Sequence, residues 1–148
     1  MKTLIQRVTK ASVVVEGNTV GEINKGILAY IGLGPEDTLQ TAKKMIDKIL
    51  TYRIFDNEAG KLDQNVQQVQ GGLLLVSQFT LMAKTDKGRR PDFGRAMAPQ
   101  IANALFEQMV AYAKQQYGEV KTGEFGANML VKADNDGPLN FILEIDYY

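Results

Sequence analysis

The chain has 148 residues, of which 45% are hydrophobic, enough for one domain, residues 1–148, around one sizeable core. Its 17 basic and 17 acidic residues cancel, so no overall field would attract a polyanion, and we expect no DNA partner. The absence of cysteine and histidine excludes disulfides, thiolate nucleophiles, imidazole catalysis and the common zinc ligands. We therefore expect no metal site.

The start of the chain and its hydropathy favour a cytoplasmic protein. Arg7, Thr9 and Lys10 interrupt the apolar stretch that a signal peptide would need. No run approaches the ~20 apolar residues that span a bilayer, so we expect no membrane partner. The lack of cysteine also fits a reducing compartment.

Strand patterns dominate the first part of the chain. Residues 4–8, 12–15 and 19–23 predict a short antiparallel meander. Residues 27–31 are apolar on both faces, which is typical of a central buried strand. A helix follows, with Asp37 as its cap and Gln40 three residues on. Its apolar residues repeat with a 3.6-residue period and are Leu39, Ala42, Met45, Ile46, Ile49 and Leu50.

The middle of the chain predicts a short strand at residues 52–55, a surface turn at 56–61 and a second buried strand at 73–76. Residues 84–95 form a basic loop. Its cations are Lys84, Lys87, Arg89, Arg90 and Arg95, against Asp86 and Asp92.

A second amphipathic helix should begin at Pro99 and end near Gly118. We expect its inner face to carry Ile101, Ala104, Leu105, Met109 and Tyr112. Residues 129–133 and 139–145 predict two further strands, separated by a turn at 134–138.

Strands outnumber helices, and the two helices interrupt groups of strands without alternating with single strands. This pattern predicts a mixed α/β fold, with an antiparallel-rich, barrel-like sheet core and two main amphipathic helices packed on it. No Gly-x-Gly-x-x-Gly motif follows a strand, which argues against a doubly wound nucleotide-binding fold.

The first candidate site is the segment Ser77-Gln78-Phe79-Thr80-Leu81, at the end of the second buried strand. Polar side chains are costly to bury there unless they meet partners or a ligand. They either bind a ligand or only satisfy neighbouring backbone groups as the chain leaves the core. Spacing alone leaves both interpretations open.

The second candidate is Asn135-Asp136-Gly137-Pro138, whose residue types are also typical of a hairpin turn. A Gly-Pro bond fixed in cis would instead form a rigid backbone corner without a side chain, able to press closely against a ligand. The basic loop is the third candidate, either as an ordinary solvated surface or as a contact for phosphates.

These segments give the chain a close resemblance, along nearly its whole length, to the D-aminoacyl-tRNA deacylase family. Ser77-Gln78-Phe79-Thr80-Leu81 and Asn135-x-Gly137-Pro138 look like that family's two signature motifs. Further landmarks that resemble the family are residues 4–8, Tyr52-Arg53-Ile54-Phe55, Asn65-Val66-Gln67-Gln68, Arg90-Pro91-x-Phe93 and Thr122-Gly123-x-Phe125. One departure is Asn140, where the family usually has threonine; we expect Asn140 to bond local backbone and preserve the corner.

The resemblance implies a homodimer that proofreads translation by hydrolysing the ester between a D-amino acid and the acceptor end of its tRNA, without a cofactor. In the family the Gly-Pro bond is cis, and Asn135, Gly137 and Pro138 of one subunit would close the site of the other. This corner would admit D-residues and glycine, including glycine mischarged on tRNA-Ala, and would exclude L side chains by a steric clash.

The same resemblance implies that backbone N–H groups around Phe79 and Thr80 hold the ester carbonyl and its developing oxyanion, while the tRNA's terminal 2′-hydroxyl assists the attacking water. Ser77 and Gln78 would line the pocket for the terminal adenosine, with Phe79 as an aromatic wall. Thr80 has been regarded in the family as a nucleophile, but no base lies near it in sequence, and we prefer a binding role. The residues inferred from charge alone to contact acceptor-stem phosphates are Lys87, Arg89 and Arg90.

Two other functions stay open on the sequence. One is a catalytically silent dimeric module of the same fold, such as an RNA-binding or interaction domain related to the editing domains of some synthetases. The lack of histidine would favour it if the substrate-assisted route were not chemically reasonable. The other is a hydrolase of a different small ester or amide, with Thr80 as nucleophile and a lysine as base.

Overall fold

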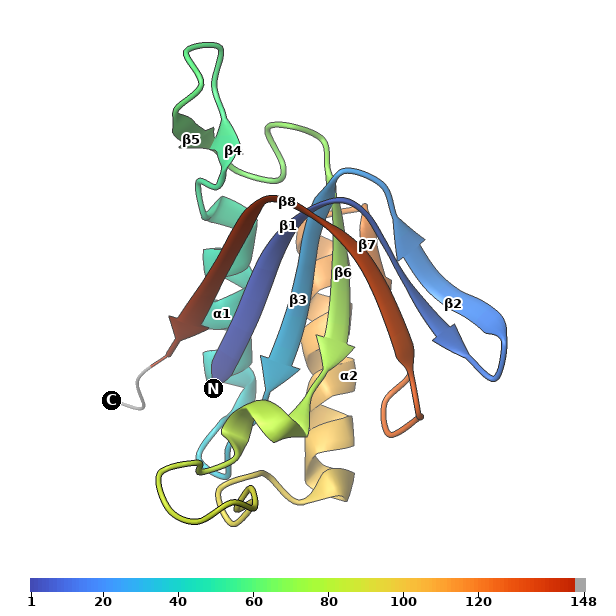
Figure 1. The fold of residues 1–148 in the computed structure, drawn as a ribbon, viewed down its shortest axis with the longest axis vertical. Helices are drawn as coiled ribbons and strands as arrows, with labels where there is room; N and C mark the ends of the chain where they lie inside the picture. Colours follow the sequence, from blue (N-terminus) through green and yellow to red (C-terminus); the bar gives the residue numbers. More distant parts are fainter. Residues whose placement is uncertain (146–148) are drawn as a thin grey trace.

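A computed structural model describes residues 1–145 of the chain (Figure 1). The elements in chain order are β1 (Lys2–Val15), β2 (Asn18–Ile23), β3 (Gly26–Gly32), α1 (Leu39–Thr51), β4 (Phe55–Asp56), β5 (Leu62–Gln64), β6 (Gly72–Ser77), the 3-10 helix η1 (Phe79–Met82), α2 (Pro99–Gln116), β7 (Val120–Thr122) and β8 (Leu130–Glu144).

The main sheet has the strand order β2-β1-β3-β6-β7, and β8 also pairs with β1. β1 is antiparallel to β2, β3 and β8, whereas β3, β6 and β7 run parallel to one another. The parallel pairs occur where α1 and α2 connect successive strands, because a parallel connection needs a long crossover. The prediction of a mixed α/β fold with a barrel-like sheet and two packed helices is confirmed.

Both helices pack on one face of the sheet, behind the strands in Figure 1. Alternate strand residues such as Ile5, Ala29 and Leu75 point toward the helices and are fully buried there. The opposite face carries a second, smaller core that includes Leu28 and Leu74. Burial on both faces explains why the predicted strands at 27–31 and 73–76 are continuously apolar.

The two longest strands correct the prediction of separate short strands at both ends of the chain. Residues 4–8 and 12–15 belong to the single strand β1, and residues 130–144 form the single strand β8. β1 and β8 pair with each other from Lys2↔Glu144 to Val14↔Leu130, with register shifts around Val8. The polar residues 134–138 are therefore an irregularity within one strand, and the hairpin turn expected there is wrong.

The start of α1 also differs from the prediction. Thr38 is the N-cap, and it forms a capping box with Thr41. Asp37 instead accepts the N–H of Gly34 at 2.7 Å and lies 3.1 Å from the terminal ammonium of Met1. Asp37 is thus engaged in joining the start of β1 to the turn before α1, and the next residue caps the helix.

The buried face of α2 is rotated from the one predicted. Leu105 and Met109 are buried, but Ile101 is 62% exposed and Ala104 is also exposed. The buried residues of this helix are Ala102, Leu105, Phe106, Met109 and Ala113. Apolar residues occur on several sides of α2, so periodicity alone did not define one face. No helix within residues 1–145 is long and apolar enough to cross a bilayer.

The short strand predicted at 52–55 is displaced. Only Phe55 of that range is in a strand, and β4 pairs with β5 in a small hairpin at one end of the molecule. Figure 1 shows this hairpin projecting beyond the main sheet, above α1. β7 was not expected from the sequence, because three residues are too few to establish a periodicity.

Gly21→Ala tests the close approach of β2 to β7. A Cβ at position 21 would lie 2.2 Å from the Thr122 carbonyl oxygen, so the backbone must move. We expect the free energy of unfolding to fall by about 1–3 kcal/mol, measured by urea denaturation. Gly118→Ala is the matched control, since a Cβ there meets nothing within 4 Å, and it should change stability by less than about 1 kcal/mol. Equal stabilities of the two variants would contradict the close approach.

Candidate active site

A cavity of about 600 Å³ opens at the end of the sheet where β3 and β6 terminate. Its walls come from the ends of these strands, the segment entering η1, the chain from Phe93 to the start of α2, the loop between β7 and β8, and the start of β8. Ser77, Gln78 and Phe79, all predicted from the sequence as site residues, line this cavity. The structure therefore brings one of the two candidate motifs to a space able to hold a small ligand.

Strand pairing positions this motif. β6 pairs with β3 as far as Ile31↔Ser77, and the N–H of Gln78 donates to the Ile31 carbonyl at 2.8 Å. The chain then turns into η1, and the first N–H groups of a helix have no acceptor within it. Among the hydrogen bonds within residues 1–145, none uses the N–H of Phe79 or Thr80 as donor. Two adjacent donors thus follow a rigid strand end.

Thr80 is exposed next to the cavity. Its hydroxyl oxygen accepts a short hydrogen bond from the side-chain amide of Gln78. An amide donor holds a hydroxyl in place but does not remove its proton, so this contact does not activate Thr80 as a nucleophile. The geometry agrees better with a positioning role than with nucleophilic attack.

None of the described residues that line the cavity has an ionisable side chain. The nearest titratable group on the strands that form it is Tyr30, which pairs with Val76 of the lining. Burial raises the pKa of the Tyr30 hydroxyl above its ordinary value, so this group is neutral near pH 7. The site therefore offers amide and hydroxyl groups, and no general acid or base of its own.

The basic loop reaches the same cavity through Phe93, whose ring lies 5.1 Å from that of Phe79. The loop is held in shape by two backbone hydrogen bonds between Lys84 and Asp92. Lys87, Arg89 and Arg90 are exposed, and none of them forms an ion pair within residues 1–145. Among the described residues, their charges are therefore not neutralised by a neighbouring carboxylate.

The second motif lies elsewhere in the same chain. The Gly137-Pro138 peptide bond is cis, and Gly137 has a φ of 123°, in a region that favours glycine. In the register of the sheet, this corner lies opposite Arg7 of β1, whereas Ser77 lies at the position of Thr3. Thr3 and Arg7 are four residues apart, which is about 13 Å along the strand. Figure 1 shows β8 passing over the end of the sheet opposite to η1. One chain does not bring the two motifs together.

Arg7 is a residue at the corner that the sequence analysis did not identify as functional. Its side chain is only 10% exposed, its Nη1 donates to the Ile54 carbonyl at 3.0 Å, and Asp56 lies 3.6 Å from the same nitrogen. Its Nε lies 3.1 Å from Asp136, close enough for an ion pair but not aligned as a hydrogen bond. A charged residue within the apolar strand of residues 4–8 was the available signal.

Asn135 fastens the corner from the other side. Its side-chain amide donates to the carbonyls of Arg7 at 3.0 Å and Leu139 at 3.3 Å. Asn140 is exposed and pairs with Gln6 in the β1–β8 ladder. Within residues 1–145 the side-chain bonds to this backbone come from Asn135 and not from Asn140, which corrects the expected role of Asn140.

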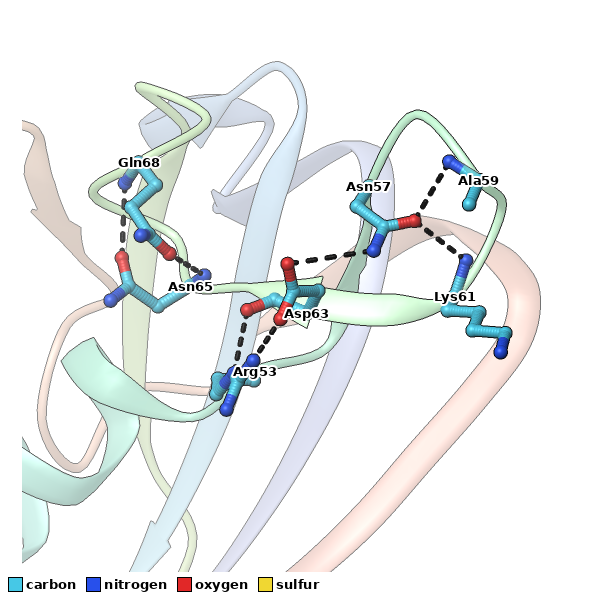
Figure 2. A network of polar contacts seen from close by, with 7 residues as sticks. All are labelled: Arg53, Asn57, Ala59, Lys61, Asp63, Asn65 and Gln68. Atoms are coloured by element: carbon cyan, nitrogen blue, oxygen red, sulfur yellow. Dashed lines mark hydrogen bonds and ion pairs between the residues drawn. The ribbon is translucent and has the colours of Figure 1, made fainter.

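The β4–β5 hairpin supports the residues that hold Arg7. Figure 2 shows Arg53 bridging to Asp63, and the Nε of Arg53 also donates to the Asp63 carbonyl at 2.7 Å. Asn57 accepts the N–H groups of Ala59 and Lys61 at 2.9 and 3.1 Å, which closes the hairpin turn (Figure 2). These contacts brace the segment from which Ile54 and Asp56 reach Arg7.

Arg7→Met tests whether the buried guanidinium stabilises the corner. The substitution keeps an unbranched side chain but leaves the Ile54 carbonyl without its donor, so we expect a loss of about 1–3 kcal/mol in unfolding free energy. Arg53→Met makes the same change at a side chain that is 66% exposed, where we expect less than about 1 kcal/mol. Urea denaturation of both variants checks this, and a larger loss for Arg53→Met would contradict it.

Comparisons with known proteins identify the family of the chain. A family model described as D-Tyr-tRNA(Tyr) deacylase matches residues 4–144. A D-aminoacyl-tRNA deacylase from Psychrobacter sp. (strain PRwf-1) is 78% identical over 145 residues, covering 98% of this chain and 99% of the relative. A D-aminoacyl-tRNA deacylase from Acinetobacter baumannii (strain AYE) is 59% identical over 146 residues, covering 99% of each chain.

Two solved structures share the fold. One, named c-Myc DNA unwinding element binding protein, has a TM-score of 0.94 at 39% identity and covers 99% of both chains. The other, described as a probable eukaryotic D-amino acid tRNA deacylase, has a TM-score of 0.87 over 97% of this chain and 98% of that one; at 16% identity it supports the fold alone. The family resemblance inferred from the motifs is confirmed. The chain belongs to the D-Tyr-tRNA(Tyr) deacylase family and is a hydrolase that acts on ester bonds.

Proposed function

We propose that this deacylase hydrolyses D-aminoacyl-tRNA with the N–H groups of Phe79 and Thr80 as its oxyanion donors and the terminal ribose 2′-hydroxyl of the tRNA as an assisting group. The observation that carries the proposal is a cavity without an ionisable side chain beside two N–H groups that have no acceptor within residues 1–145. One oxyanion donor is typically worth about 3 kcal/mol of barrier. A water molecule attacks the ester carbonyl, the bond from that carbon to the neighbouring ribose oxygen breaks, and a proton of the water passes by way of the 2′-hydroxyl to the leaving ribose oxygen.

The cavity suits the terminal adenosine of the tRNA. Its lining is largely apolar and includes Phe79 and Phe125, and an adenine base binds well on aromatic faces. Ser77 and Gln78 add hydroxyl and amide groups that can hydrogen-bond the ribose. The amide of Gln78 also orients the Thr80 hydroxyl, which we assign to positioning the substrate.

Stereochemical selection requires a second copy of the chain. The Gly137-Pro138 corner and Ser77 lie on different strands and about 13 Å apart along the strand direction, so the corner of one chain does not reach its own cavity. Gly137, Pro138 and the supporting Asn135 would instead close the cavity of a partner subunit. Each homodimer then contains two shared sites.

An apolar row on the second face of the sheet favours that homodimer. Cross-strand pairing places Ile142, Leu4, Tyr30 and Val76 side by side on β8, β1, β3 and β6. Ile142 is 64% exposed, Leu4 and Tyr30 are partly exposed, and Val76 lines the cavity. Covering this row with a second copy removes apolar surface from water and brings the partner next to the cavity.

The corner also explains the range of substrates that we propose. A backbone corner pressed against the α-carbon leaves no room for an L side chain, whereas a D side chain points away from it. Glycine has no side chain and would be admitted as well, including glycine attached to tRNA-Ala. The discrimination is then made by steric exclusion, with no group that recognises a particular D side chain.

The exposed cations Lys87, Arg89 and Arg90 would contact phosphates of the acceptor stem. They lie on the loop whose Phe93 reaches the cavity, so a bound 3′ end would run past them. Such contacts add salt-dependent affinity without sequence selectivity. We place the activity in the cytoplasm, where charged tRNA is used.

DNA binding is a second candidate function, and one observation favours it. The solved structure named for binding a DNA unwinding element is 39% identical to this chain over nearly its full length. The same exposed cations would then contact DNA phosphates. The formal net charge of zero gives no general attraction for DNA, so we rank this function second.

The function is tested with D-tyrosyl-tRNA and L-tyrosyl-tRNA in parallel deacylation assays. We expect release of tyrosine from the D-ester only, with Gly137→Ala weakening the reaction because its Cβ would lie 3.0 Å from the Leu139 nitrogen in a backbone region that favours glycine. Gly118→Ala is the control and should react like the original protein. Silence on both esters, together with tight binding to duplex DNA, would favour the second function.

The homodimer is tested with Ile142→Asp, which places a charge in the apolar row. We expect the mass in solution, measured by light scattering, to fall from two chains to one and the D-deacylation rate to fall at least about tenfold. Val20→Asp changes another exposed apolar strand residue, on β2, in the same way; it is the control and should change neither. A monomeric variant that still removed only D-tyrosine would disprove the shared site.

A further inference from the structure

Phe93 has a contact that the proposed mechanism does not use. Its ring packs against the ring of Phe79 with 5.1 Å between the centroids and 54° between the planes. Phe79 is 59% exposed, and Phe93 is the aromatic residue that its ring contacts within residues 1–145. The residue that carries one of the two candidate oxyanion donors is therefore held on its side-chain side by a residue of the basic loop.

Within residues 1–145, no hydrogen bond from another segment reaches the backbone of Phe79. Gln78 is the N-cap of η1 and forms no side-chain capping bond, and the helix is one short turn. Within residues 1–145, the hydrogen bond that ties this segment to the sheet is the one from the N–H of Gln78 to the Ile31 carbonyl, and beyond Thr80 the side chains of Leu81 and Met82 pack close to Gly32. A second point of attachment on the Phe79 ring would restrict the direction of the adjacent N–H groups.

Phe93 is itself well placed to provide that attachment. The side-chain carboxylate of Asp92 accepts the N–H of Gly94 at 2.9 Å, and the Phe93 carbonyl accepts the N–H of Ala96 at 3.0 Å. One residue later, the N–H of Met97 donates to the Leu33 carbonyl at 3.1 Å and ties the loop to the sheet. Phe93 thus lies in a turn that is fixed both locally and to the body of the protein.

We propose that Phe93 is a positioning residue for deacylation: its ring holds Phe79, and so aims the N–H groups of Phe79 and Thr80 at the ester. The inference rests on the proposed function and adds a residue to it. It also links the basic loop to the two oxyanion donors, since Phe93 belongs to the loop that carries Lys87, Arg89 and Arg90. Phosphates bound to the basic loop would therefore affect the contact between the rings of Phe93 and Phe79.

The test compares Phe93→Ala and Phe93→Tyr on two substrates: D-tyrosyl-tRNA and D-tyrosyl-adenosine, an ester without phosphates. We expect Phe93→Ala to lower kcat about 3- to 10-fold on both, since an aromatic pair contributes energy in that range, with little change in KM for the adenosine ester. Phe93→Tyr keeps the ring and should restore kcat to within about twofold. Tyr112→Leu removes an aromatic ring that does not line the cavity and should leave kcat unchanged.

A double-mutant cycle identifies the route of the effect. If Phe93 acts through Phe79, the loss of kcat caused by Phe93→Leu should disappear in a Phe79→Leu background. A Phe93→Ala protein with unchanged kcat and a raised KM for the tRNA alone would show a direct RNA contact and overturn the inference. If the original protein hydrolyses neither D-ester, the proposed function itself fails, and the two failures are thereby distinguished.

Discussion

Backbone pairing along β1 decides where both halves of the site lie. Its first residues are bonded to β3 on one side and to β8 on the other, from Lys2 to Val8. β3 in turn pairs with β6 and ends beside Ser77, while the irregular part of β8 lies opposite Arg7. One strand therefore connects the cavity and the corner and keeps them at separate levels of the sheet. This separation is the reason why we propose a site shared between two copies.

Among residues 1–145, the side chains that line the cavity are not ionisable, and the fold supplies backbone donors there instead. The end of a strand buried on both faces is a rigid place from which to present backbone donors, because its last residues are bonded to β3 and packed in two cores. Donors that do not reorganise during the reaction stabilise a developing negative charge more effectively than mobile ones. A histidine-free chain can thus hold a reactive ester in position and leave proton transfer to water and to the substrate.

The Gly137-Pro138 corner differs from the cavity, because charged and polar side chains hold it in place between β1 and β8. Arg7 reaches Ile54 and lies near two half-exposed carboxylates, Asp56 and Asp136, and Asn135 bonds the backbone on both sides. Burying a guanidinium is costly unless it is paired. Here Nη1 donates to the Ile54 carbonyl and the two carboxylates balance the charge, while Nε is held by an ion pair without a hydrogen bond. The result is a backbone segment whose shape is determined by several independent contacts, as steric exclusion of a substrate side chain requires.

The mixed fold, the two buried strands, the approximate helices and both motifs could be predicted from the sequence, because local periodicity and short motifs report burial and residue chemistry directly. The sequence also placed Ser77, Gln78 and Phe79 at a strand end. Three features could be seen only in the folded chain: β1 and β8 are continuous, one particular face of α2 is buried, and Arg7 supports the corner. Those features depend on pairing between residues as distant as Arg7 and Asn135, 128 positions apart, and a local pattern contains no information about which distant segment will be its partner.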